Sequence, residues 1–143
     1  MKKTSLFFIP LLLLWACSNE KTYTVGENAF CTGLADTEIE DVFCVDDKDM
    51  PINGLVIEYY ENGNVLREMH IKAGRENGIE KEYYENGNLR VVAEVKDGKA
   101  DGPSKLYNEN GKLYMEIDWA NGTATKIRIF DDAGNVISAA ENI

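Results

Sequence analysis

The heptapeptide Glu-Tyr-Tyr-Glu-Asn-Gly-Asn occupies residues 58–64 and returns unchanged at residues 82–88. The two copies lie 24 residues apart, a period typical of repeat proteins in which each unit is one supersecondary element. Extending the alignment in both directions gives four units, at residues 54–77, 78–101, 102–124 and 125–143. The fourth unit is the shortest, and we interpret it as a cap of the array.

Each unit has the pattern of a β-hairpin. A dipeptide that favours a two-residue type I′ turn stands in the first three units, and a related one in the fourth: Asn62-Gly63, Asn86-Gly87, Asn110-Gly111 and Ala133-Gly134. An alternating apolar run follows each glycine and indicates a half-buried strand. A second glycine closes the run in the first three units and marks the return turn. The sequence therefore predicts an all-β protein, an antiparallel β-meander of hairpins about 24 residues long.

Two-residue turns would pair Tyr60 with Val65 and Tyr59 with Leu66, and opposed side chains share a face of the sheet. On this register one face is the predicted core, formed by Val65, Met69, Ile71, Leu89, Val91, Val95, Leu106, Leu113, Met115, Ile117, Trp119, Ile127, Ile129 and Val136.

The opposite face would carry one aromatic ring per unit, beside Leu66, Arg90, Tyr114 and Ile137. Tyr and Arg are enriched in protein interfaces. We therefore take as candidate partner-binding residues Tyr59, Tyr83, Tyr107, Phe130, Tyr114 and Arg90. The alternative is that these rings only cover the sheet and one another.

The hairpin pattern, Tyr-Tyr-x-Asn-Gly-x-Leu/Val followed by a strand and Gly-x-x-x-Gly, resembles the bacterial MORN-repeat variant of the YwqK-type antitoxin family. The segment from Met50 to Gly54 resembles the start of the first unit in such proteins. The resemblance covers residues 51–143, is clear in two units, weaker in the third and degenerate in the fourth. It implies a single-layer sheet with a binding role, antitoxin- or immunity-like, rather than an enzyme.

Residues 1–16 have the pattern of a signal peptide, with Lys2 and Lys3 before a ten-residue apolar run that is too short to span a bilayer. The sequence Leu14-Trp15-Ala16-Cys17 resembles a bacterial lipobox, although Trp15 replaces the usual small residue. The resemblance implies lipidation of Cys17, a tether at residues 17–22 and a lipid-anchored place in the bacterial cell envelope, on the periplasmic or extracellular side. The alternatives are an ordinary signal peptide or a buried N-terminal helix.

Residues 23–50 do not repeat, and we interpret them as a cap over the open edge of the sheet. Val42–Val45 is a predicted strand and Asp46–Asp49 a predicted turn. With Cys17 acylated, Cys31 and Cys44 leave an even count in an exported chain, so we expect a disulfide between them. Two buried free thiols are the alternative.

Composition narrows the function. The formal charge is −10, and −12 without Lys2 and Lys3, so a nucleic-acid partner is not expected. His70 is the only histidine, so we predict no catalytic site, no metal site and no cofactor. Two classes remain: a lipid-anchored module that binds a protein or envelope component, and a structural envelope lipoprotein without a specific ligand.

Overall fold

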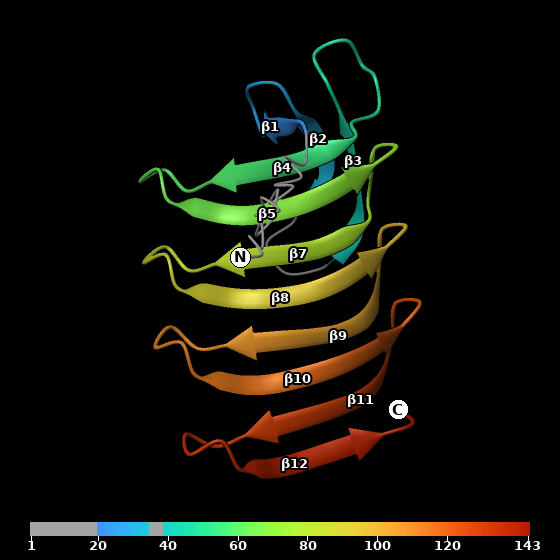
Figure 1. Cartoon of the computed structure of the whole chain (residues 1–143). Coiled ribbons are helices and arrows are strands. Elements are labelled where there is room, and N and C mark those ends of the chain that lie inside the picture. Colours follow the sequence, from blue (N-terminus) through green and yellow to red (C-terminus); the bar gives the residue numbers. More distant parts are fainter. Residues whose placement is uncertain (1–19, 35–38) are drawn as a thin grey trace, which may run out of the picture.

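The structure is a computed structural model and describes residues 20–34 and 39–143 (Figure 1). These residues form strands and turns and contain no helix, which confirms the all-β prediction. The strands are β1 (Thr22–Thr24), β2 (Phe30–Leu34), β3 (Ile39–Val45), β4 (Gly54–Tyr59), β5 (Val65–Lys72), β6 (Arg75–Glu76), β7 (Gly78–Tyr83), β8 (Leu89–Lys96), β9 (Lys99–Tyr107), β10 (Leu113–Ala120), β11 (Thr123–Phe130) and β12 (Val136–Glu141).

Four hairpins stack along one axis: β4 with β5, β7 with β8, β9 with β10, and β11 with β12 (Figure 1). Neighbouring strands of this stack pair antiparallel, which confirms the predicted meander. The exception is β1, which lies parallel to β4 with Tyr23 opposite Val56. β1 begins at Thr22, inside the predicted tether, and already at Lys21 the carbonyl accepts a hydrogen bond from the Leu55 amide at 3.0 Å.

The turn at each Asn-Gly differs from the predicted type I′ turn. In the first unit the Gly63 amide donates to the Tyr60 carbonyl at 2.9 Å, and the Tyr60 amide donates to the Asn64 carbonyl at 2.8 Å. Gly63 has a φ of 87°, whereas Asn62 is not among the residues with positive φ. This is a type I turn followed by a glycine bulge. Turns with positive φ at two central residues occur instead at the opposite ends of the strands, at Ala73-Gly74, Asp97-Gly98 and Asn121-Gly122.

A second bulge restores the predicted register within the strands. Glu58 lies opposite Arg67 and Val56 opposite Met69, as two-residue turns would have placed them. Beside the turn, however, Tyr59 pairs with Val65, because Leu66 is the extra residue. The same shift recurs in every unit. The predicted core residues Val65, Leu89, Leu113 and Val136 therefore lie opposite the aromatic rings, on the other face.

The repeated heptapeptide also connects successive units. The Tyr60 hydroxyl donates a hydrogen bond to the Tyr83 carbonyl at 2.8 Å, and the Asn64 side chain donates to the Glu85 carbonyl at the same distance. Tyr84 and Asn88 repeat both bonds to the third unit. The third unit has Asn108 in place of the second tyrosine, and there Lys112 Nζ donates to the Asp132 carbonyl at 3.2 Å.

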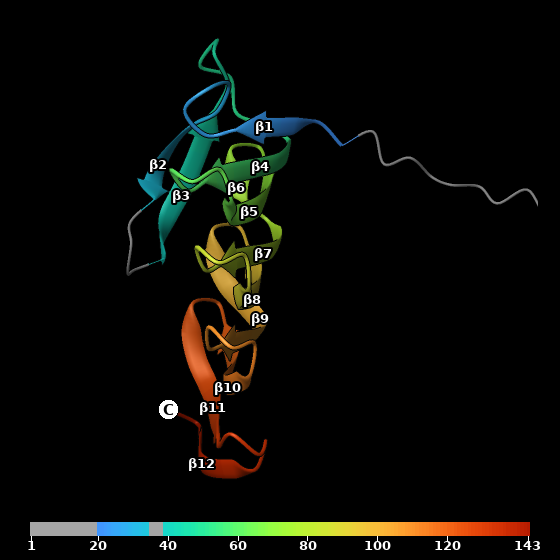
Figure 2. The ribbon, with the colours of Figure 1, turned by 90° about the vertical axis from the view of Figure 1, so that its left-hand side faces the viewer.

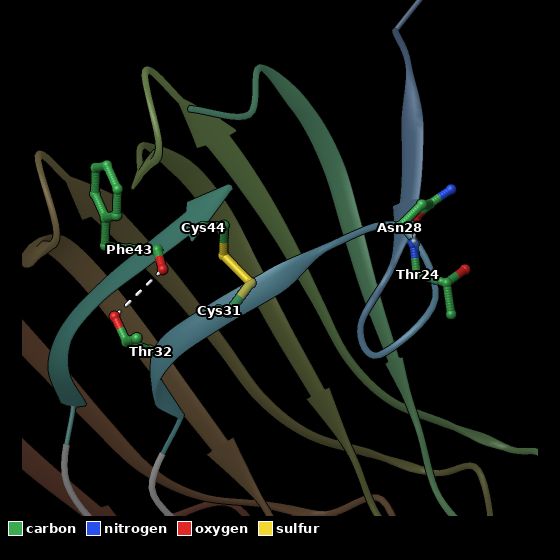
Figure 3. The surroundings of a disulfide bond; sticks show 6 residues. All are labelled: Thr24, Asn28, Cys31, Thr32, Phe43 and Cys44. Carbon is green, nitrogen blue, oxygen red and sulfur yellow. Dashed lines mark hydrogen bonds between the residues drawn. A yellow bond between two sulfur atoms is a disulfide. The ribbon is translucent and has the colours of Figure 1, made fainter. Parts of the chain in front are cut away.

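The hairpin β2–β3, here called the cap hairpin, forms a second layer beside the N-terminal part of the sheet (Figures 1 and 2). It attaches where Phe43 pairs with Arg75, and the Cys44 amide donates to the Gly74 carbonyl at 2.7 Å. Cys31 and Cys44 lie opposite each other in this hairpin and form a disulfide (Figure 3). Of the segment interpreted as an edge cap, β1 pairs with the edge strand β4, whereas the cap hairpin lies over a face of the sheet (Figure 2).

We call the face toward the cap hairpin the inner face and the opposite one the outer face. The buried core lies between the cap hairpin and the first unit, and consists of Tyr23, Ala29, Val42, Cys44, Ile52, Val56, Met69 and Ile71. Of the predicted core, only Met69, Ile71 and Val95 are buried, and Val136 is 53% exposed. The reason is that, in the described part of the chain, no second layer lies beside β9–β12 (Figure 2).

Candidate interaction surfaces

The outer face carries a row of one aromatic ring per unit, each opposite an aliphatic side chain. We call the following set the aromatic row: Tyr59 with Val65, Tyr83 with Leu89, Tyr107 with Leu113, and Phe130 with Val136. Tyr59 is 45% exposed, and the other three rings are half-buried. Burial raises the pKa of Tyr83, and the Glu68 carboxylate beside it adds to this effect, which places the Tyr83 ring near an outer-face acid.

Charged side chains beside the aromatic row pair across the strands. Lys81 Nζ lies 3.6 Å from Glu68 Oε2, and Arg128 Nη2 lies 2.7 Å from Glu116 Oε2. Lys105 also approaches Glu116, at 3.8 Å. Exposed pairs of this kind contribute little stability. They leave the outer face with an aromatic and aliphatic stripe next to charges that are largely neutralised.

Two predicted members of the binding set do not join this row. Arg90 is the bulge residue of the second unit, and its Nη2 lies 2.8 Å from Glu82 Oε2 on the inner face. Tyr114 holds the same position in the third unit and lies near Tyr84, which also adjoins Arg90. The structure therefore brings together Tyr59, Tyr83, Tyr107 and Phe130, and separates Arg90 and Tyr114 from them. The two-residue turn predicted from the sequence would place Arg90 and Tyr114 in the row, whereas both are bulge residues.

An acidic cluster on the inner face was missed in the sequence. Glu76 and Glu80 are 2% and 5% exposed, and Arg67 lies 2.8 Å from Glu82 Oε1 and 3.5 Å from Glu80 Oε1. Burial, with Glu80 nearby, raises the pKa of Glu76 to about 8. Burial, with Glu82 nearby, raises the pKa of Glu80 to about 7. Strand alternation alone would have placed Glu80 and Arg67 on this face.

Other predicted features have plain structural roles or lie outside the described residues. In the described ranges no group of three or more His, Cys, Asp and Glu side chains could hold a metal ion. His70 Nδ1 lies 2.9 Å from the Ile79 carbonyl oxygen, and its Nε2 lies 3.6 Å from Glu20 Oε2. Cys17, the predicted lipidation site, lies outside the described residues.

Comparison with known families agrees with this geometry. The family model of the MORN repeat variant matches residues 52–73, 76–97 and 100–121. The chain contains three MORN repeat variants. No curated protein matches it. The MORN matches begin at Ile52, Glu76 and Ala100, whose carbonyls accept hydrogen bonds from the amides of Gly74, Gly98 and Gly122.

Each of these bonds joins the first residue of a MORN match to the glycine just beyond its last residue. The matches therefore start two residues before the units drawn from the heptapeptide and coincide with a closed hydrogen-bonded unit. The fourth hairpin, β11–β12, lies outside the matches. MORN repeats of this number indicate a repeat-based interaction module.

Proposed function

We propose that the protein is a bacterial lipoprotein, anchored to a membrane of the cell envelope through Cys17, whose MORN repeat sheet binds a protein or another envelope component. The N-terminal charge, the short apolar run and the lipobox-like Leu14-Trp15-Ala16-Cys17 support the anchor. No helix in the described residues is long and apolar enough to cross a membrane. The proposal includes no catalytic role and no cofactor.

The observation that carries the binding role is the aromatic row. Tyr59, Tyr83, Tyr107 and Phe130 repeat once per hairpin, and each unit is joined to the next by backbone pairing, so the rings are held at a regular spacing. Aromatic side chains offer a large contact area and dominate many interfaces. An immunity-type role, in which the partner is an exported toxin, is the form of this proposal that the family resemblance favours.

The test replaces two rings of the row. Tyr83→Ser and Tyr107→Ser should each reduce capture of envelope proteins by chemical cross-linking in intact cells, with the melting temperature within a few degrees. Tyr114→Ser is the matched control, because it removes the same ring from outside the aromatic row. Equal capture by all three variants would contradict the assignment. Unfolding of both row variants would show that the rings are structural.

The second candidate is a structural envelope lipoprotein without a specific ligand. It is favoured by the direct pairing of each ring with an aliphatic neighbour, since such cross-strand pairs stabilise a sheet without any partner. If the protein is purely structural, Tyr83→Ser and Tyr107→Ser would lower the melting temperature, and cross-linking would show no partner that the unchanged protein captures and the variants do not.

A further inference from the structure

The inner face beside β9–β12 is apolar and uncovered. Its side chains pair across the strands in two rows: Leu106, Met115 and Ile129 in one, Ile117 and Ile127 in the next. The charged residues of these strands, such as Lys105, Glu116 and Arg128, lie on the outer face. We call Leu106, Met115, Ile117, Trp119, Ile127 and Ile129 the uncovered inner face.

Comparison between units shows what this surface lacks. Ile117 and Trp119 occupy the same positions as Met69 and Ile71 in the first unit, which are 0% and 4% exposed beneath the cap hairpin. Ile117 and Trp119 are only half-buried. The first unit therefore shows that this face accepts a covering β-hairpin. The acidic cluster of the second unit lies between that covered part and the uncovered inner face.

A second uncovered apolar surface lies on the cap hairpin. Cys44 and Val42 point toward the core and are buried. The alternate residues Phe30 and Phe43 remain 50% and 37% exposed, and they pair with Val45 and Thr32. This free side of the hairpin is formed by Phe30, Thr32, Phe43 and Val45, and the Phe43 ring lies beside Gly74 of the first unit.

We propose that the two surfaces meet between two copies of this chain. The molecule is stepped: two layers thick beside β4–β7 and one layer thick beside β9–β12 (Figure 2). A twofold axis across the stack would bring the free side of each cap hairpin onto the uncovered inner face of the other copy. The contact is reciprocal, so the assembly closes as a dimer.

The dimensions and charges fit this arrangement. Seven-residue β3 is about 23 Å long and the four strands β9–β12 span about 19 Å, at about 3.3 Å per residue and 4.8 Å per strand. The two-stranded cap hairpin is about 10 Å wide, so two such contacts cover roughly 460 Å² on each copy, or about 900 Å² counted over both copies, against the ~1,000 Å² that specific interfaces bury. The chain has a net charge of −10, so the apolar side chains of the uncovered inner face are where a second copy meets least repulsion.

Photo-crosslinking in the full-length protein tests the dimer. Two differently tagged copies are expressed together, with p-benzoyl-phenylalanine replacing Thr32 in one of them. Irradiation should give a product of twice the chain mass that carries both tags, with the attachment inside residues 102–130 of the second copy. The control places the same residue at position 105 on the outer face, where the yield should be at least fivefold lower.

Trp119→Lys in the second copy should lower the yield from position 32 at least fivefold, while the Cys31–Cys44 link and protease resistance are retained. If that variant unfolds, Phe30→Ser in the first copy is the replacement, because Phe30 is exposed and outside the core. Equal yields from positions 32 and 105, no product from position 32, or a product with a different protein would each overturn the proposal.

Discussion

The hydroxyl of Tyr84 donates a hydrogen bond to the main-chain carbonyl of Tyr107, 23 residues further along the chain, at 2.8 Å. Tyr60 makes the same bond to Tyr83 in the preceding pair of units. The second tyrosine of each heptapeptide thus fastens its turn to the next hairpin, while the first contributes to the aromatic row. This division of roles explains why the two tyrosines are adjacent, since successive residues of a strand point to opposite faces.

Loss of this bond should weaken the array. Tyr84→Phe keeps the ring and removes only the donor, so we expect the free energy of unfolding in urea to fall by about 1 kcal/mol. Tyr59→Phe is the control, because its ring is 45% exposed and belongs to the outer row; it should change stability by less than about 0.5 kcal/mol. Equal effects of the two variants would show that the Tyr84 bond contributes nothing.

The Asn-Gly dipeptides identified the hairpins, but they do not distinguish a type I′ turn from a type I turn with a glycine bulge. The side chain decides here: Asn62 Oδ1 accepts the Asn64 amide at 2.9 Å, which supports the second form. The extra residue at Leu66 then restores the register, so the prediction was right inside the strands and wrong beside the turn. Because the register beside the turn was wrong, Arg90 and Tyr114 were wrongly included among the residues that lie beside the aromatic rings.

The cap hairpin could not be placed from the sequence. Its pairing joins Phe43 to Arg75, and no local periodicity encodes so distant a contact. Because the core forms only where this hairpin covers the sheet, the extent of the core was equally out of reach. The disulfide pairing was expected from the cysteine count, since the chain offered few alternatives.

The buried acids Glu76 and Glu80 should make stability fall as pH rises. Unfolded glutamates lose their protons near pH 4.5, whereas burial keeps these two protonated to about pH 8 and 7. Between pH 4.5 and 8 the folded state therefore binds more protons, and unfolding becomes easier by about 1.4 kcal/mol per pH unit for each proton of difference. Arg67 opposes this shift in both carboxyls.

Urea titrations at pH 5 and pH 8 measure this effect. Glu76→Gln should reduce the loss of stability between the two pH values, because its amide stays neutral throughout. Glu61→Gln, in an exposed turn, should keep the dependence of the unchanged protein. A protein that grows more stable from pH 5 to pH 8 would contradict the assignment, as would equal slopes in both variants.

The Cys31–Cys44 bond should stabilise the cap hairpin and the core beneath it. Its two cysteines are 13 residues apart, and a loop of this size is expected to contribute about 3 kcal/mol in the chain-entropy model. The double variant Cys31→Ala and Cys44→Ala should lose stability by that amount. Peptide mapping without reductant should recover the two cysteines in one linked product. Two free thiols at these positions would exclude the bridge.

Cys17 should anchor the protein to a membrane, with only a short segment between the anchor and the sheet. The Lys21 carbonyl is already bonded to Leu55, so only residues 18–20 separate the cysteine from the sheet, and four residue steps reach at most about 14 Å. Cys17→Ser should move the protein from the membrane to the soluble fraction, because more than one acyl chain is needed for stable anchoring. The alanine variant of Cys31 and Cys44 is the control and should stay with the membrane. Mass spectrometry of the mature protein should find an acylated cysteine at the N-terminus, and cleavage elsewhere or membrane retention of Cys17→Ser would exclude the anchor.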